Sequence, residues 1–446
     1  MPKQLEPSAG TATLHGVRGP RGSRLDEFLR SGDHLLGGLR PAVAPLPVIT
    51  TAVEAAGPAL TRAAEGLGEG PAVAEAVAIR LRREGFSLVD AGSARRVSRR
   101  ELMDLSRARG RDAVRVLQAD PSLLPEVQAG SWWMAGWRAR WARAVLLSLP
   151  ATVDPLTGRM AADLAFWRGV RDAASRELWR RLTKSSYVVL CYHRIAGRFE
   201  SGQERMDVAP AAFDRQVRLL RRCGWRPLTP AQLISLHEVP DAVLPRRRYV
   251  ITVDDGFTDA VHALEGHGSE HPQLFAVTGS VGGAADWLGE VAVADWDALR
   301  RFQDGGGHVG SHARRHVPLD ELTGARLQDE LSGSLADLRA AVRVGEPLLA
   351  YPHGRHSLEV RARARQAGYR LAYTTKQGRN GPGTDRWCLR RVEPKAWDST
   401  ASFLWKVVTG ESPPGRWERR LERRWQAARL DSSAGRRSPA VVGGRG

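Results

Sequence analysis

Residues Tyr249–Ala260 read YVITVDDGFTDA and join an apolar run to a charged turn. The β-branched and aromatic residues up to Val253 predict a buried strand. Asp254 and Asp255 follow where that strand ends, and neighbouring side chains there point in different directions. One carboxylate can therefore hold a metal while the other faces a water that the metal polarises. Asp-Asp-Gly is also a common turn, so its meaning depends on the rest of the chain.

Short apolar runs recur on both sides of this segment, with amphipathic stretches between them. This alternation favours an α/β fold whose parallel sheet is closed or partly closed into a barrel, with catalytic groups at the C-terminal ends of the strands. The expected strands are residues 187–192, 249–253, 273–277, 308–312, 348–351 and 371–375, and the expected helices are 210–223, 294–303, 320–343 and 357–367.

A second motif, His312-Ala313-Arg314-Arg315-His316, has HxxxH spacing. If these residues form a helical turn, both imidazoles lie on one side, as a divalent metal requires. Two histidines and one aspartate leave coordination positions for water and substrate, which is typical of a catalytic site. The chain has 12 histidines, so this pair gains weight only in combination with the two aspartates.

Two later segments can line the same rim. Tyr351, Pro352, His353 and Gly354 follow an expected strand and turn sharply, although an ordinary Pro/Gly turn has the same composition. The segment Leu389–Val392 offers fixed positive charge, and its alternative interpretation is a solvated strand edge.

The order and spacing of these motifs resemble the polysaccharide deacetylase family, the NodB-homology domains of carbohydrate esterase family 4. YVITVDDGFTDA is similar to the family's TFDDG segment, GGHVGSHARRHVPL to its HxxxH segment and LLAYPHG to its FAYPYG segment. CYHRI at 191–195, AGYRLAYTT at 367–375 and LRRVEP at 389–394 extend the resemblance to about half of the chain. The early YHRI and the late LRRV are most similar to the poly-N-acetylglucosamine deacetylase branch.

The resemblance implies a deformed (β/α) barrel of the NodB-homology type, preceded by a mainly helical N-terminal region. It implies one divalent metal ion, commonly zinc, and an acetylated glycan as substrate. The site residues that it implies are Asp255, His312 and His316 for the metal, Asp254, His193 and Arg391 for catalysis, and Tyr351, Pro352, His353 and Gly354 for substrate binding.

The catalytic roles that the resemblance implies are distinct. Asp254 is the expected general base, and Arg391 supplies positive charge beside it. His193 is the expected general acid, because the late Leu-x-His segment of many relatives is not apparent here. Ala313 and Ala350 stand where many relatives have a serine or threonine and an arginine, respectively.

The expected reaction is removal of N-acetyl groups from an N-acetylhexosamine-containing glycan of the cell envelope. Two alternatives remain open. The same site would serve an O-acetyl esterase or a deacetylase of a small or lipid-linked amino sugar. A catalytically weak glycan-binding assembly protein would also carry these motifs.

Composition limits the partners. The formal charge is +18, but arginine outnumbers lysine by 62 to 5, which a bias in the coding DNA also produces. An anionic membrane, an acidic glycan or nucleic acid would each match this charge. We expect no nucleic acid, because no recognition motif accompanies the charge. The three cysteines are widely spaced and fit apolar filler positions.

Four regions are expected along the chain. Residues 1–130 have no assigned function and contain helical patterns at 72–85 and 98–110; residues 131–185 form a helical Trp/Arg-rich connector; 186–410 form the deacetylase domain; and 411–446 form a basic, partly disordered tail. In the connector, Trp133, Trp137 and Trp141 recur every four residues, and several arginines lie among them. Such a helix suits a membrane interface, and packing on a neighbouring helix is the alternative that we favour.

No secretory signal and no uncharged apolar stretch of 18 residues is apparent in the sequence. The expected location is therefore cytoplasmic or peripheral at the inner membrane face. Residues 132–143 and 416–429 would mediate contact with anionic lipid.

Overall fold

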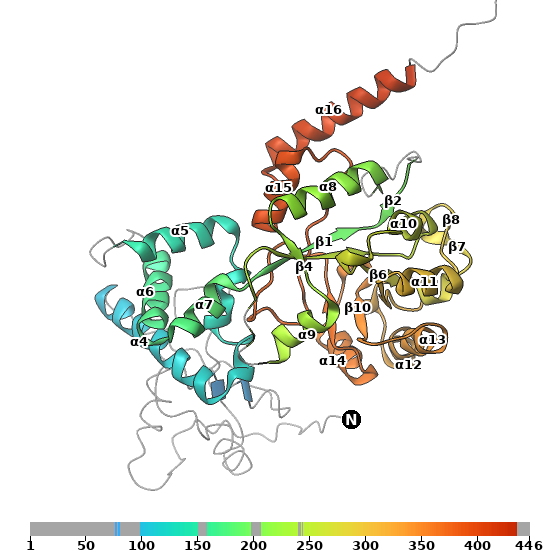
Figure 1. The fold of residues 1–446 in the computed structure, drawn as a ribbon. Helices are drawn as coiled ribbons and strands as arrows, with labels where there is room; N and C mark the ends of the chain where they lie inside the picture. The colour runs from blue at the N-terminus through green and yellow to red at the C-terminus, as the bar shows by residue number, and fades with distance from the viewer. Residues whose placement is uncertain are drawn as a thin grey trace, which may run out of the picture. The chain divides into compact units, whose positions relative to one another are not determined.

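The computed structural model describes residues 76–77, 79–80, 99–149, 158–197, 207–239, 242 and 244–434, which divide into two compact units (Figure 1). The first unit contains the described residues up to Ser185 with the short segments Ser235–Leu244 and Gly381–Asp385, and the second contains the rest. Of the expected helical pattern at 72–85, only four residues are described, and these are helical. The end of the expected tail, from residue 435, lies outside the described residues.

The first unit is helical in its described parts, as expected. Its core contains a cluster of tryptophans. Two of its helices also cross closely, so that a Cβ at Gly110 or at Gly169 would lie 2.0 Å from a backbone oxygen of the facing helix. Glycine is therefore required at both crossing positions. The elements are α4 (Arg99–Ala119), η2 (Pro121–Leu123), η3 (Gln128–Met134), α5 (Trp137–Ser148), α6 (Gly158–Ala173) and α7 (Arg176–Lys184).

The connector tryptophans do not share one helix. Trp133 lies in η3, which ends at Met134, and Trp137 begins the separate helix α5 after the non-helical Gly136. The neighbouring Trp132 is 5% exposed and packs edge-to-face on Trp167 with ring centroids 4.9 Å apart. Packing therefore accounts for the start of the connector, whereas Trp141 on α5 is 67% exposed.

The second unit is built on a parallel sheet whose strands follow the order β1, β5, β6, β9, β10, β11, with β4 beside the start of β5. Its six long strands match the six expected strands, and each ends within two residues of the expected end. They are β1 (Tyr187–Tyr192), β5 (Arg248–Val253), β6 (Gln273–Ala276), β9 (His308–Ser311), β10 (Leu348–Ala350) and β11 (Leu371–Tyr373); β4 is Arg226–Pro227.

The segment Leu389–Val392 closes this sheet. On one side, the Leu389 N–H donates to the Ala372 carbonyl at 3.0 Å; on the other, the Val392 N–H donates to the Val189 carbonyl at 2.9 Å. Parallel bridges thus join the segment to both β11 and β1. Leu389 and Val392 are fully buried, so the alternative of a solvated strand edge is wrong. The fold is a deformed (β/α) barrel, as expected.

The helices cover the barrel as expected, with one irregularity. The stretch 320–343 is not one α-helix, because a π-helical segment at Asp329–Gly333 separates α12 from α13. The helices are α8 (Pro210–Arg222), α9 (Pro230–Glu238), α10 (Thr258–Ala263), α11 (Trp296–Asp304), α12 (Gly324–Gln328), α13 (Ser334–Ala341), α14 (Leu358–Ala367), α15 (Thr400–Thr409) and α16 (Gly415–Ala434). Two short strand pairs lie apart from the main sheet: β2 (Arg194–Ile195) with β3 (Asp207–Val208), and β7 (Ala284–Ala285) with β8 (Val291–Ala292).

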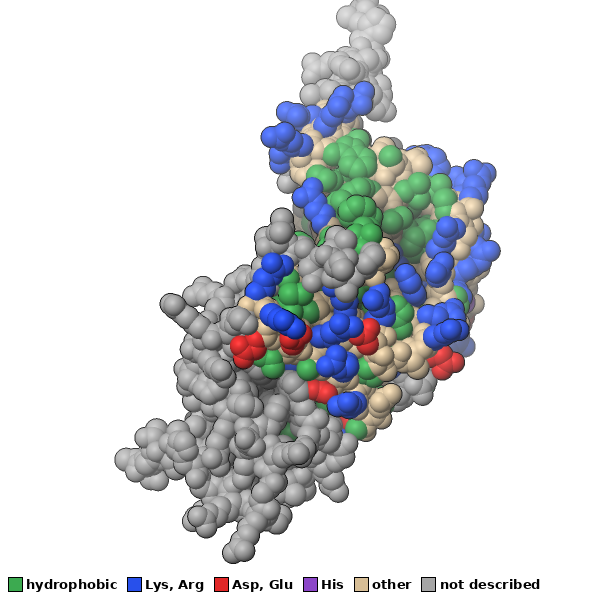
Figure 2. Space-filling model, turned by 90° about the vertical axis from the view of Figure 1, so that its left-hand side faces the viewer, with side chains coloured by type: hydrophobic (Ala, Val, Ile, Leu, Met, Phe, Trp, Pro, Cys, Tyr) green, Lys and Arg blue, Asp and Glu red, His purple; other side chains and the backbone are tan. Residues whose placement is uncertain are grey.

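The C-terminal helix α16 is longer than expected and has a basic face. Two ring contacts, Trp405 with Trp417 and Trp397 with Trp425, hold it on the second unit. Basic side chains are visible along it and over the rest of the face in Figure 2. None of the described helices combines the length and low charge needed to cross a bilayer. The exposed arginines of α16 are Arg416, Arg419, Arg420, Arg423 and Arg424.

Contact of this face with anionic lipid stays a prediction, and a triple variant tests it. Replacing Arg419, Arg420 and Arg423 with glutamine should weaken binding to vesicles with anionic lipid about a hundredfold, because each arginine near such a surface contributes about 1 kcal/mol. Vesicle sedimentation at low and high salt measures the effect. A control variant with equal charge loss replaces the exposed Arg301, Arg326 and Arg339. Equal partitioning of the wild type into neutral and anionic vesicles would contradict the prediction.

Candidate active site

The Asp254 carboxylate forms a buried, bidentate ion pair with Arg391. Its two oxygens lie 2.7 Å from Nη1 and 2.7 Å from Nη2 of the guanidinium. Arg391 Nε donates to the Thr374 carbonyl at 2.9 Å, and both charged side chains are at most 2% exposed. Burial by itself raises the pKa of Asp254, but the Arg391 cation more than offsets it and holds that pKa well below its usual value. Asp254 is therefore ionised.

Asp255 points toward two histidines. Its Oδ1 atom is buried and has no hydrogen-bond partner, although it lies 3.5 Å from His312 Nε2 and 3.4 Å from His316 Nε2. One ligand atom from each of the three residues falls within 4.8 Å of the others. Tetrahedral bonds of about 2.1 Å separate neighbouring ligand atoms by about 3.4 Å, so the group fits a zinc-sized divalent cation. An unpartnered buried carboxylate oxygen is otherwise costly.

Residues 312–316 do not form a helical turn, the backbone form under which HxxxH spacing would place both imidazoles on one side. Strand β9 ends at Ser311, and Ala313 then adopts a left-handed conformation with φ of 64°. The Ser311 hydroxyl accepts the Ala313 N–H at 3.0 Å, which stabilises this turn. A loop therefore brings the two imidazoles together. HxxxH spacing is compatible with a loop as well as with a helix.

The two imidazoles are oriented by different contacts. His312 Nδ1 lies 2.8 Å from the Ala350 carbonyl oxygen, and this partner directs Nε2 toward Asp255. Ala350 stands where many relatives have an arginine, but it can still orient His312 because the acceptor is its backbone oxygen. His316 instead stacks on Trp287, with ring centroids 4.8 Å apart, and contacts His353 at 4.4 Å.

His316 is held in the neutral form. Burial, and secondarily the nearby His312, lowers the pKa of His316 to about 2. A neutral imidazole is the form that binds a metal.

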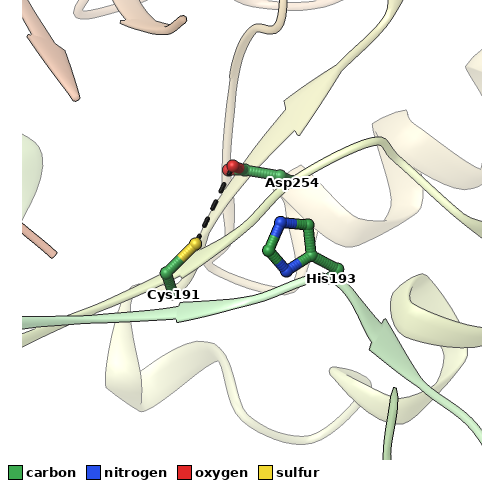
Figure 3. Close-up of side chains that lie close together, drawn as sticks. All are labelled: Cys191, His193 and Asp254. Carbon is green, nitrogen blue, oxygen red and sulfur yellow. Dashed lines mark hydrogen bonds between the residues drawn. The ribbon is translucent and has the colours of Figure 1, made fainter. Parts of the chain in front are cut away.

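His193 lies beside Asp254, as Figure 3 shows together with Cys191. Its Nδ1 atom is 3.4 Å from Glu393 Oε1, and its side chain is 16% exposed. Cys191 Sγ lies 3.8 Å from Asp254 Oδ2. These three residues form a second group with metal-ligand types, but the Arg391 cation already engages Asp254. A second cation there would be repelled, so the Asp255 group is the better candidate.

The segment Tyr351–Gly354 forms η9 (Pro352–Gly354) after β10 and brings one side chain to the site. Tyr351 and Pro352 are buried, and the Tyr351 N–H donates to the Tyr373 carbonyl at 3.1 Å. His353 is exposed with φ of 56° and lies against His316. A Cβ at Gly354 would lie 2.2 Å from Thr375 Oγ1, so only glycine fits this turn.

Sequence reasoning missed three residues that contact the site. Trp287 stacks on His316, Glu393 contacts His193, and Glu330 binds the loop between the histidines. Trp287 and Glu330 stand outside the motifs and carry no signal of their own. Glu393 lies within the quoted LRRVEP segment and was the one that proximity to a motif would have indicated.

Part of the chain matches a known protein family. Residues 242–372 match the model of the polysaccharide deacetylase family, which confirms the resemblance over the segment from Asp254 to Tyr351. No curated protein matches the chain significantly.

Three solved structures are similar at low identity. Deacetylase PplD from Streptococcus pyogenes, in complex with acetate, is 20% identical over 51% of this chain and 100% of that one, with a TM-score of 0.44. A polysaccharide deacetylase from Bacillus cereus is 23% identical over 50% and 70%, with a TM-score of 0.43. IcaB from Ammonifex degensii is 22% identical over 51% and 98%, with a TM-score of 0.43.

The protein should bind one divalent ion, and His312→Ala or His316→Ala should each abolish tight binding without unfolding the barrel. With zinc bound, X-ray absorption should give oxygen and nitrogen ligands at about 2.0 to 2.2 Å. Metal content after dialysis measures the loss. His262→Ala is the matched control, since His262 is exposed on α10. Undiminished metal content in both site variants would refute the assignment.

Proposed function

We propose that the second unit removes N-acetyl groups from an N-acetylhexosamine-containing polysaccharide, with one divalent ion, zinc, held by Asp255, His312 and His316. The observation that carries the proposal is their convergence with the Asp254–Arg391 ion pair at the ends of parallel strands. The family match over residues 242–372 supports deacetylation of a polysaccharide as the reaction class.

When bound, the ion would act as a Lewis acid toward the acetamide carbonyl and toward a water. Asp254 is the base that takes a proton from this water. Its ionised state follows from the Arg391 pair, and the bidentate contact also fixes the plane of the carboxylate. The water oxygen then bonds to the acetyl carbon, and that oxygen leaves in the acetate product.

His193 is the proposed general acid. When the carbon–nitrogen bond breaks, the electron pair stays with the sugar nitrogen, which needs a proton to leave as an amine. The His193 imidazole supplies it from beside Asp254, and its Nδ1 atom lies 3.4 Å from Glu393 Oε1. The products are acetate and a glycan with a free amino group.

A substrate panel tests the proposed reaction. The metal-loaded protein should release acetate from N-acetylated hexosamine oligomers faster than from O-acetylated glycans or from monomeric N-acetylated sugars. Acetate is measured by a coupled assay, with the Asp254→Asn variant as the catalytic blank. Preference for the O-acetyl or monomeric substrates would favour the esterase or small-substrate alternative. Glycan binding without any acetate release would favour an assembly protein.

His193→Ala should keep its metal and its substrate affinity while losing about 100- to 10,000-fold in turnover, because general acid catalysis contributes this much. His353→Ala should be milder. Metal content, KM and kcat are measured for both variants and for the exposed-residue control His262→Ala. Near-normal turnover of the His193 variant would transfer the role to His353.

A further inference from the structure

The loop between the two histidines is held from two opposite sides. On one side, the N–H groups of Thr278 and Gly279 donate to the carbonyls of Ala313 and Arg314 at 3.2 and 2.8 Å. On the other side, a single carboxylate accepts the loop's own N–H groups. Glu330 Oε2 accepts the Arg314 N–H at 3.0 Å and the Arg315 N–H at 2.8 Å.

Glu330 is fully buried, and its charge is compensated by this loop. Its second oxygen, Oε1, accepts from Arg315 Nε at 2.6 Å. A carboxylate is retained in an interior only when such partners replace its water. Glu330 acts on the two backbone amides that lie between the two histidines.

An irregular helix brings Glu330 to the loop. The π-helical segment Asp329–Gly333 interrupts α12 and α13, and such segments are rare and often occur at functional sites. Asp329 also contacts the Arg314 guanidinium, and a Cβ at Gly333 would lie 2.9 Å from Arg314 Cζ. Three of the segment's residues therefore lie against the loop that carries the histidines.

We infer that Glu330 is a positioning residue that sets the separation of His312 and His316 for the cation, and this inference rests on the proposed metal site. The loop has left-handed φ at Ala313 and no regular hydrogen-bond ladder. The fully buried carboxylate accepts two N–H groups of a loop in which Ala313 is buried and Arg315 is exposed. Without it, the Nε2 atom of His316 is no longer held 3.4 Å from Asp255 Oδ1.

The test is metal affinity in Glu330→Gln. The amide keeps the shape, but one of its two terminal groups donates hydrogen bonds. That group faces either the two loop N–H groups or Arg315 Nε, so at least one contact is lost. Affinity for Zn²⁺, measured by competition with a chromophoric chelator, should fall about 10- to 100-fold, as is typical when a partner behind the ligands is lost.

Two controls separate positioning from general damage. Asp329→Asn alters the neighbouring carboxylate, which pairs with the Arg314 and Arg315 side chains, and should keep near-normal affinity. Glu359→Gln makes the same chemical change at an exposed residue of α14. The Co²⁺ absorption spectrum of Glu330→Gln should also show altered ligand geometry, which loss of global stability alone would not produce.

The outcomes are distinct. Normal Zn²⁺ affinity and an unchanged Co²⁺ spectrum in Glu330→Gln overturn the inference while leaving the proposed function intact. A wild type that binds no divalent ion overturns the proposed metal site itself. If Glu330→Gln does not fold, Glu330→Asp takes its place: the shorter carboxylate keeps the charge but cannot span the same contacts, and unchanged affinity in that variant also overturns the inference.

Discussion

The buried ion pair between Asp254 and Arg391 is the constraint on which the site depends. It joins residues 137 positions apart in the sequence, one at the end of β5 and one in the segment that closes the barrel. Removing one partner of such a pair typically costs about 3 to 5 kcal/mol, because the other charge stays buried alone. Since Leu389 and Val392 flank Arg391 and supply the closing hydrogen bonds, barrel closure and charge compensation require the same placement of this segment.

Backbone groups orient several of the side chains at the site. The carbonyl of Ala350 orients His312, and the amides of Arg314 and Arg315 bind Glu330. These contacts do not depend on the side chain at the contributing position. This explains why Ala350 and Ala313, which depart from the family pattern, are compatible with the observed arrangement. Ala313 is itself fully buried in a left-handed turn, where a small side chain fits.

The site's two carboxylates have opposite environments despite being neighbours. Asp254 faces a cation, which lowers its pKa, while burial raises the pKa of Asp255 and the nearby His312 only partly offsets this. The positive φ of 73° at Asp255 turns its side chain away from that of Asp254. The proposed proton acceptor and the proposed metal ligand are thereby separated at adjacent positions of one turn, which the proposed hydrolysis needs.

The sequence by itself determined the strands of the barrel and the motifs at their ends, because alternating apolar runs and strand-end polar residues are local patterns. The HxxxH spacing left the backbone form of residues 312–316 open, since spacing alone does not distinguish a helix from the loop that forms. Only the tertiary structure decided that Glu330 meets the histidine loop and that Trp287 meets His316, and it showed that the Arg391–Asp254 pair, which the family resemblance implied, lies inside a closed barrel. These contacts join segments far apart in the chain, and their energies depend on burial, which no local pattern encodes.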